Sequence, residues 1–269
     1  MQLKLEQAQY RSDHGQLRSK DHDIENSCAA VVNQFSAHTL KEQSAITLAD
    51  RTDSKFLLPV RVLPRFLGAL NSNYTILEES GHRVFTYENT YFDTPAWDLY
   101  LQHQNGKLNR HKFRLRRYHE TDISYFEKKF KTNKDRTVKE RVNCTDVQSS
   151  GIVVEEDIVK PSLYVNYRRV TLWNHAANER LTLDYDLCYR RPEKAKVARL
   201  DGLLIAELKR HGNASDSPFV KTAKDHGFSP KKFSKYCTGV CLTDNGSLKN
   251  NRFKSTLTDI KKASELWER

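Results

Sequence analysis

The sequence lacks several features that define large classes of protein. No stretch approaches ~18 consecutive apolar residues, so we expect no transmembrane helix. Residues 1–15 contain no apolar run of the secretory type, and we expect a cytoplasmic protein. The chain has no G-x-x-x-x-G-K-[ST] or G-x-G-x-x-G motif, which argues against P-loop and Rossmann chemistry.

Cysteine is scarce and odd in number. The five cysteines are scattered over the chain, at positions 28, 144, 188, 237 and 241. In a reducing compartment we predict that they are free thiols. Cys237 and Cys241 lie four residues apart, but no second Cys or His pair at metal-ligand spacing accompanies them, so we expect no zinc site.

Positive charge is what the sequence has in excess. Its 45 Lys and Arg against 34 Asp and Glu give a net charge of +11. Such an excess indicates an anionic partner, and composition alone leaves nucleic acid, an anionic membrane and phosphorylated small molecules open.

A length of 269 residues fits one large domain or one domain with appendages. We predict a polar or helical N-terminal extension at 1–45, a central domain at 46–242 and a helical C-terminal tail at 243–269. In the tail, Ile260, Ala263 and Leu266 recur at three-residue spacing, which indicates an amphipathic helix.

A period of two dominates the central domain. It predicts about eight strands, near 51–58, 84–92, 111–119, 123–131, 136–143, 163–172, 180–188 and 203–210. Helices are expected at 61–71, 95–104 and 216–226. Asp93 is placed to cap the second of these helices, and Gly227 follows the third at a C-cap position. The pattern is that of an α+β protein dominated by antiparallel strands.

Charged and apolar residues alternate within these strands. Because successive side chains point to opposite faces, each strand gathers its charge on one face. The residues of the charged faces are Arg51, Asp53, Lys55, Lys112, Arg114, Arg116, Glu127, Lys129, Lys131, Lys139, Arg141, Tyr167, Arg169, Arg180, Thr182, Asp184, Asp186, Glu207 and Lys209. For a single strand, a polar face turned to water is the simpler interpretation. Over seven or eight strands, the repeated Arg and Lys favour a shared interior.

Eight strands are also the number that closes into a barrel with a narrow interior. We therefore predict an eight-stranded antiparallel β-barrel tunnel with a charged interior and with helices packed outside. An interior of like charges repels itself unless a bound polyanion neutralises it. Arginine binds phosphate oxygens in a bidentate way, and carboxylates facing phosphate are suited to hold Mg²⁺ or Mn²⁺. Phosphate and metal are thus expected in one cavity.

Seven motifs occur in a fixed order along the chain. They are YFDTP (91–95), KFRLRRY (112–118), FEKK with a following KER (126–141), NYRR (166–169), RLTLDYD (180–186), AELKR (206–210) and FSKYC (233–237). Over residues 48–241 this ordered set resembles the VTC domain, the polyphosphate polymerase domain of the triphosphate tunnel metalloenzyme superfamily. The resemblance implies an eight-stranded tunnel that transfers the γ-phosphoryl group of ATP to a growing polyphosphate chain with Mn²⁺ or Mg²⁺.

The resemblance also implies roles for individual residues. The catalytic set would be Lys55, Arg114, Arg116, Lys129, Lys139, Arg169 and Lys235. Tyr167 and Ser234 would bind substrate, and the strand alternation adds Lys112, Arg141 and Lys209 to that group. Glu207 would be the metal ligand. The first strand reads Arg-x-Asp-x-Lys where the cyclase and thiamine-triphosphatase branch has Glu-x-Glu-x-Lys, which favours the polymerase branch.

Two other functions stay open on the same scaffold. One is an inorganic triphosphatase, and the other is a non-catalytic sensor that binds polyphosphate. Nucleic acid is not expected as a partner, because the basic residues are spread over alternating strand positions and form no stacking platform. The sequence predicts no particular oligomeric state.

Overall fold

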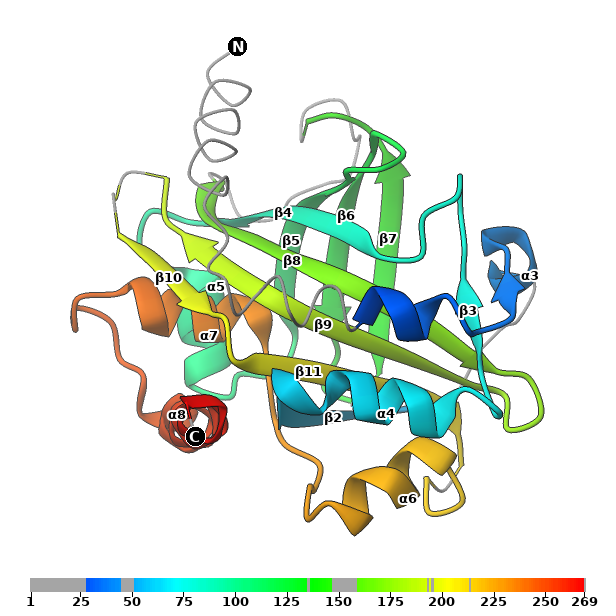
Figure 1. Ribbon diagram of the computed structural model, residues 1–269. Coiled ribbons are helices and arrows are strands. Elements are labelled where there is room, and N and C mark those ends of the chain that lie inside the picture. Colours follow the sequence, from blue (N-terminus) through cyan, green and yellow to red (C-terminus); the bar gives the residue numbers. More distant parts are fainter. Residues whose placement is uncertain are drawn as a thin grey trace.

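A single twisted sheet dominates the computed structural model, which describes residues 28–44, 51–134, 136–146, 159–192, 194, 196–212 and 214–268 (Figure 1). Eight strands form its main path, and each pairs antiparallel with the next. In spatial order they are β2 (Arg51–Pro59), β11 (Leu203–His211), β9 (Glu179–Arg190), β8 (Lys160–Asn174), β4 (Phe85–Asp93), β5 (Arg110–Tyr118), β6 (Ile123–Lys131) and β7 (Thr137–Asn143). All eight predicted strands are confirmed within a few residues.

Three short strands extend the sheet beside this path. β1 (Ala37–His38) pairs parallel with β3 (Thr75–Leu77), which pairs in turn with β8. β10 (Val197–Leu200) pairs with β9. These strands are two to four residues long, too short for an alternating pattern to be recognised in the sequence.

The predicted closed barrel of eight strands is wrong. The sheet has eleven strands, and it is not closed, since β2 and β7 stand at opposite ends of the path and no pairing joins them among the described residues. The outer edge of β2 is occupied in another way. The backbone N–H of Lys231 donates to the carbonyl of Lys55 at 2.7 Å, so the loop before α7 takes a position that a closing strand would need.

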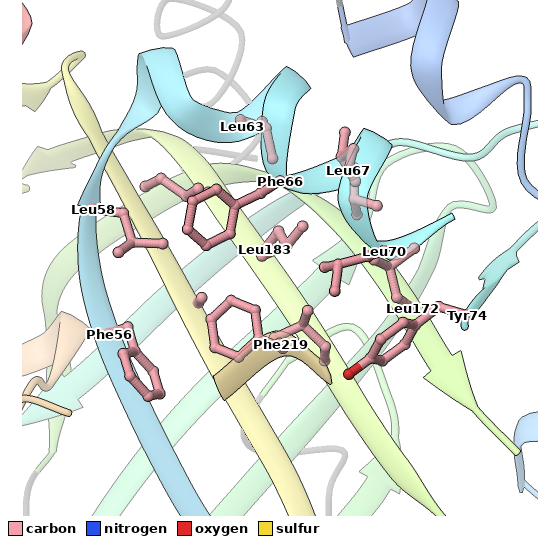
Figure 2. Close-up of a cluster of buried hydrophobic side chains, with 14 of the residues drawn as sticks. Phe56, Leu58, Leu63, Phe66, Leu67, Leu70, Tyr74, Leu172, Leu183 and Phe219 are labelled. Carbon is pink, nitrogen blue, oxygen red and sulfur yellow. The ribbon is translucent and has the colours of Figure 1, made fainter. Parts of the chain in front are cut away.

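The convex face of the sheet carries the largest apolar core (Figure 2). α4 (Leu63–Leu70) and α6 (Pro218–Asp225) cover this face, so these two helices pack outside the sheet as predicted. α4 buries Leu63, Phe66, Leu67 and Leu70, which recur at the spacing of one helical stripe. From the strands, Phe56 meets Phe219 of α6 edge to face, with ring centroids 5.1 Å apart.

Two of the predicted helix signals act as expected. The Asp93 carboxylate accepts from the backbone N–H of Leu99 and of Tyr100, each at 2.9 Å, and so caps α5 (Asp98–Gln104). Gly227 follows α6 with a φ of +75°, a conformation that favours glycine. The helices expected at 61–71, 95–104 and 216–226 are thus confirmed as α4, α5 and α6.

The remaining helices lie at the two ends of the chain. α3 (Leu40–Ser44) belongs to residues 28–44, whose Cys28, Val32 and Phe35 pack into the convex core. Near the C-terminus are α7 (Lys235–Thr243), α8 (Lys254–Glu268) and the 3₁₀ turn Asn251–Phe253, and a further 3₁₀ turn spans Val60–Val62. The tail helix is therefore present as α8, with Ile260 and Ala263 buried. The side chain of Leu266 and residues 1–27 lie outside the described part, and the three-part division of the chain stays a prediction.

α7 fills one end of the opposite, concave face. Tyr236, Cys237 and Val240 of this helix pack in an apolar cluster with inner-face residues of the sheet, which include Leu57, Leu163, Val165, Leu187, Tyr189 and Ile205. A side chain at Gly239 would collide with Tyr189 and Leu163, so glycine is what lets the helix lie this close.

All five cysteines are free, as predicted, and four of them are buried. No helix in the described part of the chain is both long enough and apolar enough to cross a membrane.

Candidate active site: a basic concave face

The charged side chains of the strands gather on the concave face, next to the cluster that α7 fills. We call this set the basic face. It comprises Lys55, Lys112, Arg114, Arg116, Lys129, Lys139, Arg141, Arg169 and Lys209, with Lys235 of α7 and the carboxylates Glu127, Asp184 and Glu207 among them. Their strand neighbours Phe56, Leu183 and Leu208 point the other way, into the convex core. The predicted separation of charged and apolar faces is therefore confirmed for these strands.

Asp186 departs from the predicted pattern. The pairing of β8 with β9 shifts register between Asn166 and Arg168, and Asp186 adopts a φ of +54°. Its carboxylate accepts from Arg199 at 3.0 Å on β10. After this bulge Leu187 and Tyr189 face inward, so Asp184 is the carboxylate that β9 gives to the basic face.

The two ends of the sheet approach each other across the basic face. On the path, β6 is six strand spacings from β2, which is roughly 29 Å along a flat sheet. That distance exceeds the screening length of about 8 Å in physiological salt several-fold. The sheet does not lie flat, because β5, β6 and β7 run upright behind the diagonal strands β8 and β9 (Figure 1). In agreement with this curl, Lys55 of β2 adds to the burial and lysine repulsion that lower the pKa of Lys129 of β6.

Glu207 holds the lysines at the β2 end of the basic face. Its carboxylate pairs with Lys55 at 2.9 Å and with Lys209. Although burial acts in the opposite direction, Lys209 and then Lys55 keep the pKa of Glu207 well below its usual range. Burial lowers the pKa of Lys209 to about 8 against the attraction of Glu207. The carboxylate is ionised at neutral pH.

Asp184 organises the centre of the face. It is completely buried and accepts from Arg169 Nε at 2.5 Å and Nη2 at 2.8 Å, and it also binds Lys235. Burial opposes ionisation, but Arg169 and Lys235 together lower the pKa of Asp184 to about 2. Lys235 Nζ lies 4.5 Å from the ring centroid of Tyr167. A helix outside the sheet path thus delivers a cation to the centre.

Ser234 links the same helix to β5. Its hydroxyl accepts from Lys112 Nζ at 3.1 Å and from the backbone N–H of Cys237 at 3.3 Å, which caps α7. Asp93 connects α7 to α5, because its carboxylate accepts from the Tyr236 hydroxyl of α7 and from the backbone N–H of Leu99 in α5. The start of α7 is therefore fixed on both sides, and Ser234 and Lys235 point into the basic face.

Glu127 gathers the arginines of the β5–β7 side. It accepts from Arg114 Nε at 2.5 Å, and Arg116 and Arg141 each lie 3.8 Å from its other oxygen. Against the effect of burial, Arg114 and then Arg116 lower the pKa of Glu127 to about 2. Asn89, buried on β4, accepts from Arg116 Nε at 3.1 Å and donates to the carbonyl of Val165.

Asn89 is a site residue that the sequence prediction omits. It shares the inward parity of Tyr87 and Tyr91 on β4, so the strand alternation could have indicated it. Its neutral side chain made it inconspicuous among charged residues.

Three lysines face one another in a row on neighbouring strands. Lys112 is directly opposite Lys129, and Lys129 is directly opposite Lys139. Like charges in such positions destabilise a sheet. Burial, followed by repulsion from Lys112, Lys139 and Lys55, lowers the pKa of Lys129 to about 7, although its side chain still contacts solvent. A bound polyanion would remove this repulsion.

The structure thus brings the predicted site residues together, but with different degrees of enclosure. Arg116, Tyr167 and Asp184 are buried, whereas Lys139 and Arg141 on the edge strand β7 are exposed. The described residues contain no group of three or more His, Cys, Asp or Glu that could hold a metal ion. Glu207 pairs with two lysines, so a metal bound to this carboxylate would also need oxygen ligands from substrate and water.

The candidate site thus consists of cations and paired carboxylates on the concave side of a curled antiparallel sheet. The sequence matches the VTC domain family over residues 50–159 and 151–243. The chain therefore belongs to the VTC domain family.

Solved structures give more distant similarities. A putative adenylate cyclase of Vibrio parahaemolyticus is 15% identical, with a TM-score of 0.45, over 71% of this chain and 97% of that chain. A putative adenylyl cyclase of Hippeastrum, described with a dominant triphosphatase activity, is 13% identical, with a TM-score of 0.45, over 70% and 94%. A protein of Pyrococcus horikoshii is 15% identical, with a TM-score of 0.39, over 68% and 94%. No curated protein matches the sequence.

Proposed function

We propose that the chain is an ATP–polyphosphate phosphotransferase that moves the γ-phosphoryl group of ATP to a growing polyphosphate chain. The observation that carries this proposal is the row formed by Lys112, Lys129 and Lys139, with Lys55 near Lys129 across the concave face. Like charges directly opposite one another repel, and a linear chain of phosphates complements such a row. Membership of the VTC domain family supports the same substrate class.

Phosphoryl transfer requires positioning of the reactants and neutralisation of the charge on the transferred group. Arg114, Arg116 and Arg169 are held by Glu127, Asn89 and Asp184, so their guanidinium groups are oriented before substrate arrives. A terminal oxygen of the polyphosphate chain attacks the γ-phosphorus, the bond to the bridging oxygen breaks, and ADP leaves. The attacking oxygen is already ionised at neutral pH, so no general base is needed.

Glu207 would hold Mn²⁺ or Mg²⁺. Its low pKa keeps the carboxylate ionised, and Mg²⁺ is commonly bound by one or two carboxylates plus substrate phosphates. When bound, such an ion neutralises charge on the phosphate oxygens. Lys55 and Lys209, which pair with Glu207 here, would then be available to the phosphate chain.

One observation favours a second candidate, an inorganic triphosphatase. Lys129 and Lys139 are exposed to solvent at the β7 end of the sheet path, where water can reach a bound phosphate. Water in place of the terminal phosphate would turn transfer into hydrolysis.

Incubation of the purified protein with ATP and Mn²⁺ or Mg²⁺ separates these functions. Long phosphate chains on a stained polyacrylamide gel support the polymerase, and free phosphate alone supports the triphosphatase. Tight polyphosphate binding without turnover would overturn both in favour of a polyphosphate sensor.

A further inference from the structure

Two tyrosines and an arginine form a compact group at the end of the basic face that lies away from α7. Arg141 Cζ stands 3.5 Å from the ring centroid of Tyr125, and Arg141 Nη2 donates to the Tyr118 hydroxyl at 3.1 Å. The rings of Tyr118 and Tyr125 meet edge to face, with centroids 6.0 Å apart. We call these three residues the aromatic mouth.

The position of the aromatic mouth follows from the strand register. On β4, Tyr91 stacks on Tyr236 of α7, whereas Tyr87, four residues earlier, is paired with Tyr118 of β5. Tyr118 therefore lies at the other end of the concave face from α7.

The rings of the aromatic mouth differ from the other tyrosines nearby. Tyr87 and Tyr167 stack on each other and are buried, at 6% and 2% exposure, so their ring faces are already covered. Tyr118 and Tyr125 are only partly buried, and the side chain of Arg141 is 45% exposed. A planar group from solvent can extend the Tyr125–Arg141 stack.

The aromatic mouth is in line with the phosphate-binding arginines. Tyr118, Arg116 and Arg114 share the inner face of β5 at two-residue spacing, so Arg116 lies about 7 Å and Arg114 about 14 Å along the strand from Tyr118. This arrangement suits a ligand with a planar group at one end and a chain of anionic groups extending inward.

We propose that the aromatic mouth binds the base of the nucleoside triphosphate. Stacking on tyrosine and arginine recognises any base through its π-face, and it contributes nothing to a bare phosphate chain. The aromatic mouth thus makes the site prefer a nucleotide as phosphoryl donor over an inorganic one. This inference rests on the proposed transfer from ATP, since it assigns the place of the donor's base in the same site.

The test measures dissociation constants by calorimetry for ATP, ribose 5-triphosphate and tripolyphosphate. In the wild type we expect ATP to bind about tenfold more tightly than ribose 5-triphosphate, which lacks the base. In Tyr125→Leu we expect ATP to weaken about tenfold and tripolyphosphate less than twofold. Tyr125→Phe keeps the ring and should behave as the wild type for all three ligands.

Equal binding of ATP and ribose 5-triphosphate by the wild type would overturn the inference without recourse to a variant. Equal weakening of ATP and tripolyphosphate in Tyr125→Leu would also overturn it, because Tyr125 would then serve only to hold Arg141. In either case, tight binding of tripolyphosphate leaves the proposed function standing. Failure of the wild type to bind any of the three ligands overturns both proposals.

Discussion

Lys129 is the residue whose ionisation reports most directly on the basic face. Its pKa of about 7 means that the free protein has released much of this proton at pH 8. A bound phosphate chain raises the pKa by attraction, so the complex holds the proton again. Binding should therefore take up protons at pH 8, and affinity should fall as pH rises above 7.

Calorimetry of tripolyphosphate binding in buffers of different ionisation enthalpy measures this uptake. Lys129→Met should remove most of it, with Lys209, whose pKa is about 8, contributing the remainder. A wild type that binds tripolyphosphate without proton exchange at pH 8 would show that Lys129 does not face the ligand.

Arg114 and Arg117 offer a matched pair on one strand. Arg114 faces inward and pairs with Glu127, whereas Arg117 pairs with Glu88 at 3.1 Å and Asp122 at 2.6 Å on the other face. Replacing Arg114 by Ala should lower kcat/KM for ATP by about 10²- to 10³-fold, since a preorganised charge is lost from the transition state.

The Arg117→Ala control should keep kcat/KM within a few-fold of the wild type. Circular dichroism should show both variants folded. Comparable losses of activity in the two variants would contradict the assignment of the inner face as the site.

At the scale of elements, α7 is the segment that sequence reasoning misses. Strands and helices can be recognised from sequence periodicity only when one of their faces is polar. In α7, however, five consecutive residues are buried, namely Tyr236, Cys237, Thr238, Gly239 and Val240. A helix enclosed between the sheet and neighbouring helices has no polar stripe to recognise. Ser234 and Lys235 could be predicted only through their motif, not through the element that carries them.

A substitution at Gly239 tests whether the packing of α7 against the sheet controls the position of the Lys235 side chain. Gly239→Ala places a methyl group against Tyr189 and Leu163, and we expect a loss of about 1–3 kcal/mol in unfolding free energy together with lower activity. Gly68 is the matched control, because a methyl group added there in α4 meets nothing within 4 Å.

Gly68→Ala should raise the unfolding free energy by about 0.5–1 kcal/mol, through helix propensity, without changing activity. Chemical denaturation and an activity assay on both variants provide the measurements. Full activity in Gly239→Ala would show that α7 can shift without disturbing the site.

The strands themselves could be predicted because their composition alternates so regularly. In the consecutive pairs Lys55–Phe56 and Glu207–Leu208, the apolar residue indicates which face of the strand is buried in the core. The bulge at Asp186 could not be predicted, since a positive φ at an aspartate has no separate signal in the sequence. A single such residue reverses the faces of the rest of β9.

At the scale of the whole molecule, curvature could be predicted but closure could not. The number of charged strands indicated a shared interior, and the influence of Lys55 on Lys129 supports that convergence. Closure depends on what occupies the outer edges of two strands far apart in sequence. The bond from Lys231 to the edge of β2 is one long-range contact that no periodicity encodes.

The convergence of cations has a consequence for stability. A polyanion that binds the folded state alone stabilises it by about 2.7 kcal/mol at a concentration one hundred times its Kd. Thermal unfolding should therefore shift upward with tripolyphosphate, and less so at high salt, because part of the basic face is exposed. An unchanged Tm at saturating tripolyphosphate would contradict binding to the folded protein.

The most direct measurement is a crystal structure with tripolyphosphate bound. The phosphates should lie on the concave face, within hydrogen-bonding distance of Arg114 and Lys129 on one side and of Lys55 on the other. Tripolyphosphate bound instead to lysines on the outer surface, with the concave face free of phosphate, would contradict the central claim that both ends of the sheet serve one site.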